Sequence, residues 1–183
     1  MKTQNQTMLS ENTLTSRPTD IIAGFPVRPG FFELNGATPL SNGVNFTAHT
    51  RHGTSCELLL FHSEEEEPFA VLPFPNACRI GDVYSMIVMG LDIEDLEYGY
   101  RIDGPYEPEK GHIFDKTKVL LDPYAKAVAG QREWGQQKIG SYHARVVRDS
   151  FDWEDMPQST RKISDLIIYE LHVRGFTQDS SSG

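Results

Sequence analysis

Apolar and polar residues alternate in a series of short runs between residues 44 and 102. Val44, Phe46 and Ala48 fall on one face of an expected strand, which follows the turn sequence Ser41-Asn42-Gly43. Glu64–Glu67, before Pro68, is a like-charged turn. The further strands expected from the pattern are Cys56–Phe61, its hairpin partner Phe69–Phe74, then Val83–Met89 and Tyr98–Ile102. Short strands separated by turn residues at this spacing predict a mainly β fold, an antiparallel β-sandwich.

The pattern changes after Tyr106. Pro123, inside the apolar run 119–128, suits the first turn of a short helix running through Ala127. Residues 144–147 are a short strand candidate. Leu166–Val173 is nearly continuously apolar, which is typical of a buried parallel strand. Such a strand needs neighbours and crossover helices, so we expect the chain to stop just as a second domain begins.

Composition and charge narrow the classes of partner. Hydrophobic residues make up 38% and aromatic residues 10% of the chain, as in a globular protein. The net charge of −9 argues against nucleic acid and against an anionic membrane surface. No apolar run approaches the roughly 18 residues of a membrane span. The polar N-terminus has no signal-peptide core, so we predict a cytoplasmic protein.

Several groups of polar side chains have residue types that occur in catalytic or metal sites. His49 and His52 have the spacing of metal ligands on a helix, but they follow a strand and are better read as exposed loop residues. The acidic residues 64–67 and 92–97 are better read as solvated connections than as paired catalytic acids. Cys56 and Cys78 are read as small buried hydrophobes, although a disulfide stays open. The residues themselves therefore indicate no catalytic residue, no metal and no cofactor.

Three runs together carry a resemblance to a known family. They are Tyr98–Phe114, Lys118–Ala127, and Phe151–Trp153 followed by Leu166–Thr177. In this order and spacing they resemble the N-terminal region of isoamylase-type glycogen debranching enzymes, in glycoside hydrolase family 13 with carbohydrate-binding module family 48. The match covers roughly residues 25–177.

The resemblance implies an immunoglobulin-like sandwich of the glycogen-binding type, followed by the first strand of a truncated (α/β)8 barrel. The expected organisation is a flexible segment over 1–24, the sandwich over 25–130, a linker over 131–164 and the start of the barrel over 165–183. In that family two carboxylic acids and a further aspartate, on later barrel strands, hydrolyse the glucan. No catalytic residue is therefore assigned, and the chain is expected to be inactive alone.

The implied function is that of a non-catalytic module of an enzyme that hydrolyses α-1,6 branch linkages. Its expected partners are branched α-glucan, as glycogen or limit dextrin, and its own missing catalytic barrel. Sugar rings stack on aromatic side chains, so Trp134, Tyr106 and Phe114 are candidate glucan contacts, with packing as the alternative. Trp153 and Tyr124 are predicted to pack between domains. The alternatives are a stand-alone glucan-binding or scaffolding module, and the N-terminal part of a branching enzyme, a pullulanase or a trehalose-releasing hydrolase.

Overall fold

The structure is a computed structural model of the 183-residue chain. It describes residues 17–130, 142–148, 152 and 160–182. The chain divides into two units, Met1–Asp149 and Ser150–Gly183, and each is described by itself.

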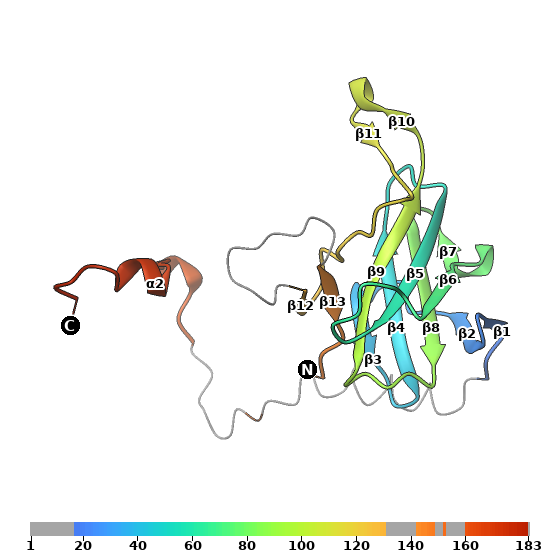
Figure 1. The fold of residues 1–183 in the computed structure, drawn as a ribbon, viewed down its shortest axis with the longest axis horizontal. Coiled ribbons are helices and arrows are strands. Elements are labelled where there is room, and N and C mark those ends of the chain that lie inside the picture. The colour runs from blue at the N-terminus through green and yellow to red at the C-terminus, as the bar shows by residue number, and fades with distance from the viewer. Residues whose placement is uncertain (1–16, 131–141, 149–151, 153–159, 183) are drawn as a thin grey trace. The chain divides into compact units, whose positions relative to one another are not determined.

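The first unit contains a six-stranded antiparallel sheet in the order β1-β2-β8-β4-β3, with β7 paired to β8 (Figure 1). The pairing of β4 with β8 is the longest in this sheet, from Gly43↔Met89 to His49↔Val83. The bounds are β1 Asp20–Ile22, β2 Phe25–Pro29, β3 Gly36–Pro39, β4 Gly43–His49, β7 Arg79–Ile80 and β8 Val83–Met89.

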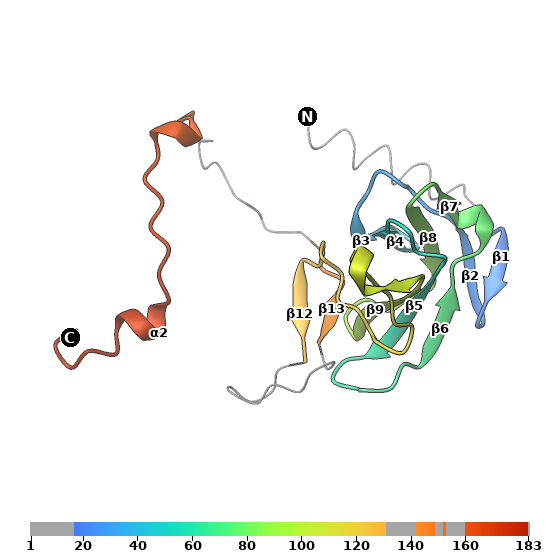
Figure 2. The same cartoon turned by 90° about the horizontal axis from the view of Figure 1, so that it is seen from above.

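A five-stranded antiparallel sheet, in the order β12-β13-β9-β5-β6, faces the first (Figure 2). Its longest pairing joins β5 to β9, from Ser55↔Asp103 to His62↔Leu96. The bounds are β5 Ser55–His62, β6 Ala70–Pro73, β9 Leu96–Asp103, β12 Ala127–Ala129 and β13 His143–Arg145, with the 3-10 helix η1 Asn76–Cys78 after β6.

The core lies between the two sheets. Val44 and Phe46 of β4 pack in one cluster with Leu58 of β5 and Tyr98 of β9, and all four are fully buried. The rings of Phe46 and Tyr98 meet edge to face, with centroids 5.2 Å apart. The predicted antiparallel sandwich is confirmed, as are the strands expected over 44–48, 56–61, 69–74, 83–89 and 98–102.

The outer face of β4 is also buried, which the alternating pattern did not predict. Asn45 and Thr47 lie on that face and are covered by the backbone around Phe31. The Phe31 N–H donates to Asn45 Oδ1 at 2.8 Å, and Thr47 Oγ1 lies 2.7 Å from Ser85 Oγ. Gly30 passes so close that a Cβ there would collide with Asn45 and Ser85. A polar residue can occupy a buried position when its hydrogen bonds are satisfied, so polarity alone did not show exposure.

Three local predictions are corrected. The helix expected through Ala127 is a turn followed by β12, because the Asp122 side chain accepts the Tyr124 N–H and closes the chain at this point. The strand expected over Leu166–Val173 is absent: residues 166–172 form no strand, because no neighbouring strand in the described residues supplies hydrogen bonds. The predicted linker 131–164 contains β13, which belongs to the sandwich because it pairs with β9. The other predicted boundaries stay predictions.

The second unit has little regular structure in its described residues. It contains the 3-10 helix η3 Ile163–Asp165 and the single-turn helix α2 Val173–Phe176. Its apolar side chains are exposed, Ile167 and Ile168 among them. Across the described part of the chain, no helix combines the length and apolar character needed to cross a membrane.

Candidate functional site

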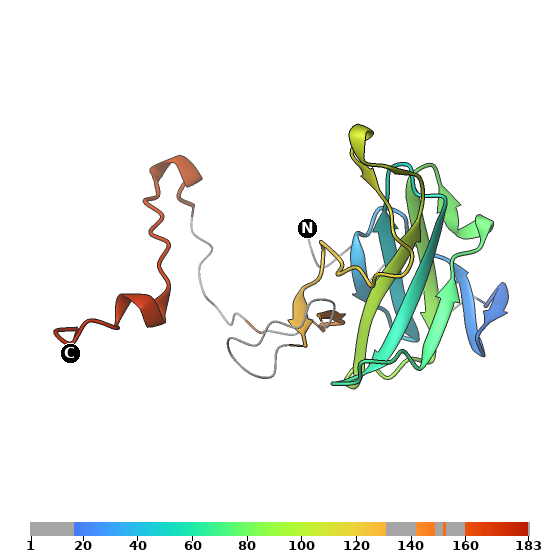
Figure 3. The same ribbon diagram turned by 45° about the horizontal axis from the view of Figure 1, so that its top comes forward.

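A small hairpin extends from one end of the sandwich, beyond the end of β9 (Figures 1 and 3). It consists of β10 Tyr106–Glu107, the 3-10 helix η2 Pro108–Lys110 and β11 His112–Ile113. Gly111 closes the turn with a φ of +79°, a left-handed conformation that favours glycine. The Gly111 N–H donates to the Pro108 carbonyl at 3.0 Å, so the tip is held by the backbone itself.

Charged and aromatic contacts hold the base of the hairpin. Glu107 Oε1 accepts from Lys110 Nζ at 2.9 Å, and Glu107 Oε2 lies 3.4 Å from His112 Nδ1. These contacts, Lys110 first, hold the pKa of Glu107 below its usual range. The His112 ring lies against the ring of His52, with centroids 4.6 Å apart. His49 and His52 are both exposed, as the sequence indicates.

Tyr106 is the exposed aromatic side chain of this hairpin, with 72% of its surface open to solvent. It stands opposite Ile113, which is also exposed, so the hairpin presents an apolar pair away from the core. A phenol ring in this position offers a flat face to the C–H side of a sugar ring and a hydroxyl group to its edge. The predicted contact Phe114 differs, because it is half-buried, packs against the core cluster and crowds Gly104. Trp134 and Trp153 lie outside the described residues.

Tyr124 lies on the segment that follows the hairpin, and 53% of its surface is exposed. The segment is fixed to β9 at two places. Leu120 exchanges both backbone hydrogen bonds with Tyr100, at 2.7 and 3.0 Å. Asp122 is buried, and its Oδ2 accepts from the Tyr98 hydroxyl at 2.8 Å. Leu121 is also exposed, so this segment, held to β9 at Leu120 and Asp122, carries two exposed apolar side chains.

Burial of Asp122 makes the stability of the fold depend on pH. Desolvation raises the pKa of Asp122 above 3.8, although the hydrogen bonds from Tyr124 and Tyr98 oppose the shift. The folded protein thus holds this proton more tightly than the unfolded chain does. The contribution to stability is zero at low pH and becomes unfavourable as the pH rises from 3.8 through the folded pKa.

We therefore expect Asp122→Asn to gain stability relative to the parent chain as the pH rises through this window. Asparagine keeps an acceptor for the Tyr124 N–H and a group that can bond Tyr98, without the buried charge. Urea unfolding between pH 3 and 7 measures the difference. Asp115→Asn is the matched control, because hydrogen bonds from Thr117 lower the pKa of Asp115 and its substitution should give the opposite trend. A difference for Asp122→Asn that does not change with pH would contradict the assignment.

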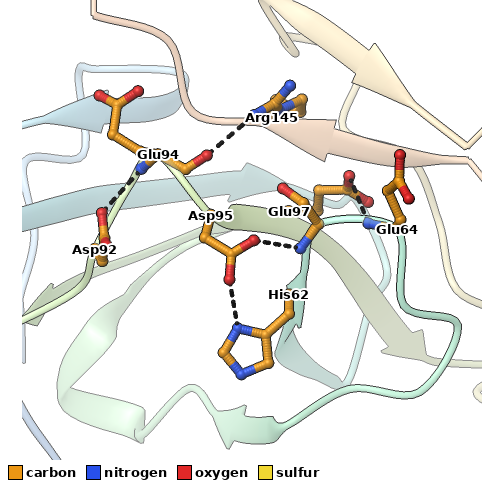
Figure 4. Close-up of polar contacts among 8 residues, drawn as sticks. His62, Glu64, Asp92, Glu94, Asp95, Glu97 and Arg145 are labelled. Carbon is orange, nitrogen blue, oxygen red and sulfur yellow. Dashed lines mark hydrogen bonds and ion pairs between the residues drawn. The ribbon is translucent and has the colours of Figure 1, made fainter.

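A cluster of charged residues lies at the end of the sandwich opposite the hairpin, where β5 ends and β9 begins (Figure 4). His62 Nδ1 lies 3.0 Å from Asp95 Oδ2, and the Ser63 N–H donates to Asp95 Oδ1 at 3.0 Å. Arg145 of β13 donates to the Glu94 carbonyl at 3.1 Å. The two acidic stretches that the sequence shows as separate connections are thus neighbours, and Asp95 acts as an anchor between them.

Glu97 differs from the other acidic residues because it is buried. Its side chain is 3% exposed and that of His143 is 5% exposed, and Glu97 Oε2 lies 3.1 Å from His143 Nδ1. Glu97 Oε1 accepts from the Glu64 N–H at 3.2 Å. The His143 ring stacks on Phe61 with centroids 3.8 Å apart. The prediction from the sequence placed Glu97 among the solvated acidic residues. Its position between Leu96 and Tyr98, in a central strand, was the signal in the sequence that Glu97 is buried.

The described residues contain no group of three or more His, Cys, Asp and Glu side chains arranged to hold a metal ion. Cys56 and Cys78 are buried free thiols, in agreement with their reading as small hydrophobes. Burial raises the pKa of Cys56 to about 12 and that of Cys78 to about 11, so neither is a nucleophile near neutral pH.

The two facing antiparallel sheets define the class of fold as an immunoglobulin-like β-sandwich. Residues 35–125 match the family model of carbohydrate-binding module 48, the isoamylase N-terminal domain, and this part of the chain belongs to that family. The predicted resemblance to the N-terminal region of isoamylase-type debranching enzymes is confirmed.

Curated relatives agree with this assignment, and a solved structure shares the fold. Over 160 residues the chain is 37% identical to isoamylase 3, chloroplastic, of Oryza sativa subsp. japonica, covering 81% of this chain and 20% of that protein. It is 35% identical over 156 residues to a glycogen debranching enzyme of Salmonella typhi, covering 78% and 23%. The chain thus spans about a fifth of the length of the curated relatives it matches. A crystal structure of pullulanase type I from Bacillus subtilis str. 168 complexed with maltose shares the fold, with a TM-score of 0.53, 22% identity and coverage of 84% and 18%.

Proposed function

We propose that the chain is the non-catalytic N-terminal module of an α-glucan debranching enzyme, and that it binds branched α-glucan such as glycogen or limit dextrin. The observation that carries the proposal is the family match over residues 35–125, which contains β3 to β9, with strands of both sheets, and the exposed hairpin. The hydrolysis of α-1,6 linkages would belong to a catalytic barrel. A cytoplasmic location stays a prediction, and the relatives include proteins named as chloroplastic.

In this proposal one surface of the module binds glucan and another packs against the catalytic barrel. Tyr106, on the hairpin, stacks on a glucose ring of the glucan. Leu121 and Tyr124 face the barrel, because exposed apolar side chains on a rigid support are suited to packing against another domain. A stand-alone glucan-binding module remains the alternative, and it would need Tyr106 but not Tyr124.

The expected result is that glycogen retards the 183-residue chain in native gel electrophoresis, and that Tyr106→Ala weakens this retardation. Losing one stacking ring of this kind costs about 1 kcal/mol, or about fivefold in affinity. Tyr106 is exposed and outside the core, so the substitution should leave the unfolding transition unchanged.

Tyr106→Phe is the matched control, because it keeps the ring and removes only the hydroxyl group. We expect it to retain most of the affinity. Absence of retardation for the parent chain would overturn glucan binding, and equal affinity of the parent and alanine chains would remove Tyr106 from the site.

A further inference from the structure

Three aromatic rings form a surface at the end of the sandwich opposite the hairpin. Phe69 precedes β6, His62 ends β5, and Phe25 begins β2 in the other sheet. The rings of Phe25 and Phe69 have centroids 6.2 Å apart, and those of His62 and Phe69 are stacked at 4.4 Å with an angle of 28°. Figure 2 shows β6 beside β2, so these rings cross the side of the sandwich from one sheet to the other. We call them the His62 surface.

The His62 surface is open to solvent where a ligand would need it. Phe69 is 40% exposed, and the His62 side chain is 51% exposed although Phe69 covers one face of its ring. Core packing would account for Phe25 and Phe69. It does not require a half-exposed imidazole held flat on Phe69.

The orientation of His62 is fixed by Asp95. A carboxylate only accepts hydrogen bonds, so His62 Nδ1 carries the proton in the 3.0 Å contact with Asp95 Oδ2. The hydrogen bond from the Ser63 backbone, and then that from His62, lower the pKa of Asp95, so the anchor stays charged. The second ring nitrogen, Nε2, points away from Asp95 (Figure 4), and within the described part of the chain the hydrogen bond found for His62 uses Nδ1, which leaves Nε2 for a ligand hydroxyl group.

The charges around the surface favour a neutral ligand. The acidic turn Glu64–Glu67 begins two residues after His62 in the chain, and Glu64 and Asp92 appear in the same cluster of side chains (Figure 4). This negative charge opposes phosphates and other anions. Both oxygens of Asp95 are engaged, by His62 and by Ser63, so this carboxylate holds the ring and does not face a cation. An aromatic face beside an oriented hydrogen-bonding nitrogen is suited to a hydroxyl-rich sugar ring.

We propose that His62 and Phe69 form a second α-glucan contact, separate from Tyr106; this inference rests on the proposed function. The two contacts lie at opposite ends of β9, an eight-residue strand. Leu96, at its start, pairs with His62, and Asp103, at its end, leads to the hairpin that carries Tyr106. A strand of this length is roughly 24 Å long. A branched glucan offers many chain ends, and two contacts on one module would raise its apparent affinity above that for a short linear glucan.

The test is a titration of the 183-residue chain with maltoheptaose, followed by backbone and imidazole NMR signals. We expect shifts at His62, Ser63 and Phe69 that persist in Tyr106→Ala. His62→Ala should weaken binding at this surface about fivefold and leave the shifts at Tyr106 unchanged. His49→Ala is the matched control, because it removes another exposed histidine, from β4, and should change the affinity less than twofold.

The outcomes separate this inference from the proposed function. Shifts at the hairpin without shifts at His62 and Phe69 would overturn the second contact and leave the module a glucan binder. Shifts that survive unchanged in His62→Ala would also overturn it. The absence of glucan-induced shifts anywhere would overturn both.

Discussion

Replacing Glu97 by alanine is expected to lower the free energy of unfolding by about 3–5 kcal/mol, a large part of the stability of an ordinary domain. Glu97 accepts from the Glu64 N–H and contacts His143, and both side chains of the pair are almost fully buried. Alanine would remove the contact with the His143 ring nitrogen and the acceptor that Glu97 supplies to the Glu64 N–H. Removing one partner of a buried pair is costly because the other stays desolvated.

Urea unfolding monitored by circular dichroism measures this loss. Glu97→Gln keeps an acceptor of the same size and should lose less than Glu97→Ala. Glu94→Ala is the matched control, because Glu94 is exposed in the adjacent connection and its side chain should contribute within about 0.5 kcal/mol. A loss below about 1 kcal/mol for Glu97→Ala would show that the pair contributes little.

Glu97 also marks the limit of what the sequence could predict. The strands over 44–48, 56–61, 69–74, 83–89 and 98–102 follow from local alternation and turn residues, and they were predicted because those signals do not depend on distant parts of the chain. The burial of Glu97 depends on His143, which is far away in sequence and arrives with β13. Asp122 is a similar case, since its burial depends on Tyr98. The apolar neighbours of Glu97 in the sequence are a signal of burial, but they do not show which distant residue will be its partner.

The two wrong predictions of secondary structure have the same cause. Leu166–Val173 has the composition of a buried strand, but a strand exists only with neighbours that accept its hydrogen bonds. Pro123 favours the first turn of a helix, but the Asp122 side chain bonds the Tyr124 N–H and makes a turn instead. In both places the local sequence favours the predicted element, but the hydrogen-bonding partners that are present or absent there determine the structure. For the candidate site, the sequence indicated Tyr106 but not the His62 surface, which is assembled from both sheets.

Ending the chain at residue 126 is expected to prevent stable folding, although this cut keeps the whole family match over 35–125. The cut removes β12 and β13. It takes away the buried side chains of His143, Ala144 and Val146. It also leaves Glu97 buried without His143 and leaves part of β9 as an unpaired edge. Leaving Glu97 buried without its partner costs about 3–5 kcal/mol, and the lost apolar contacts add to that cost.

A chain ending at residue 148 is the matched control for this cut. It keeps β13, and the described residues it removes, 152 and 160–182, are all exposed and belong to the second unit. We expect it to unfold cooperatively with a midpoint within a few degrees of that of the full chain, whereas the chain ending at 126 should show no cooperative transition by circular dichroism. Equal midpoints for the two shortened chains would mean that the family match folds without β13, and that the contact between Glu97 and His143 is dispensable. Because β13 pairs directly with β9, which leads to the hairpin carrying Tyr106, loss of the fold at 126 should also abolish the retardation by glycogen.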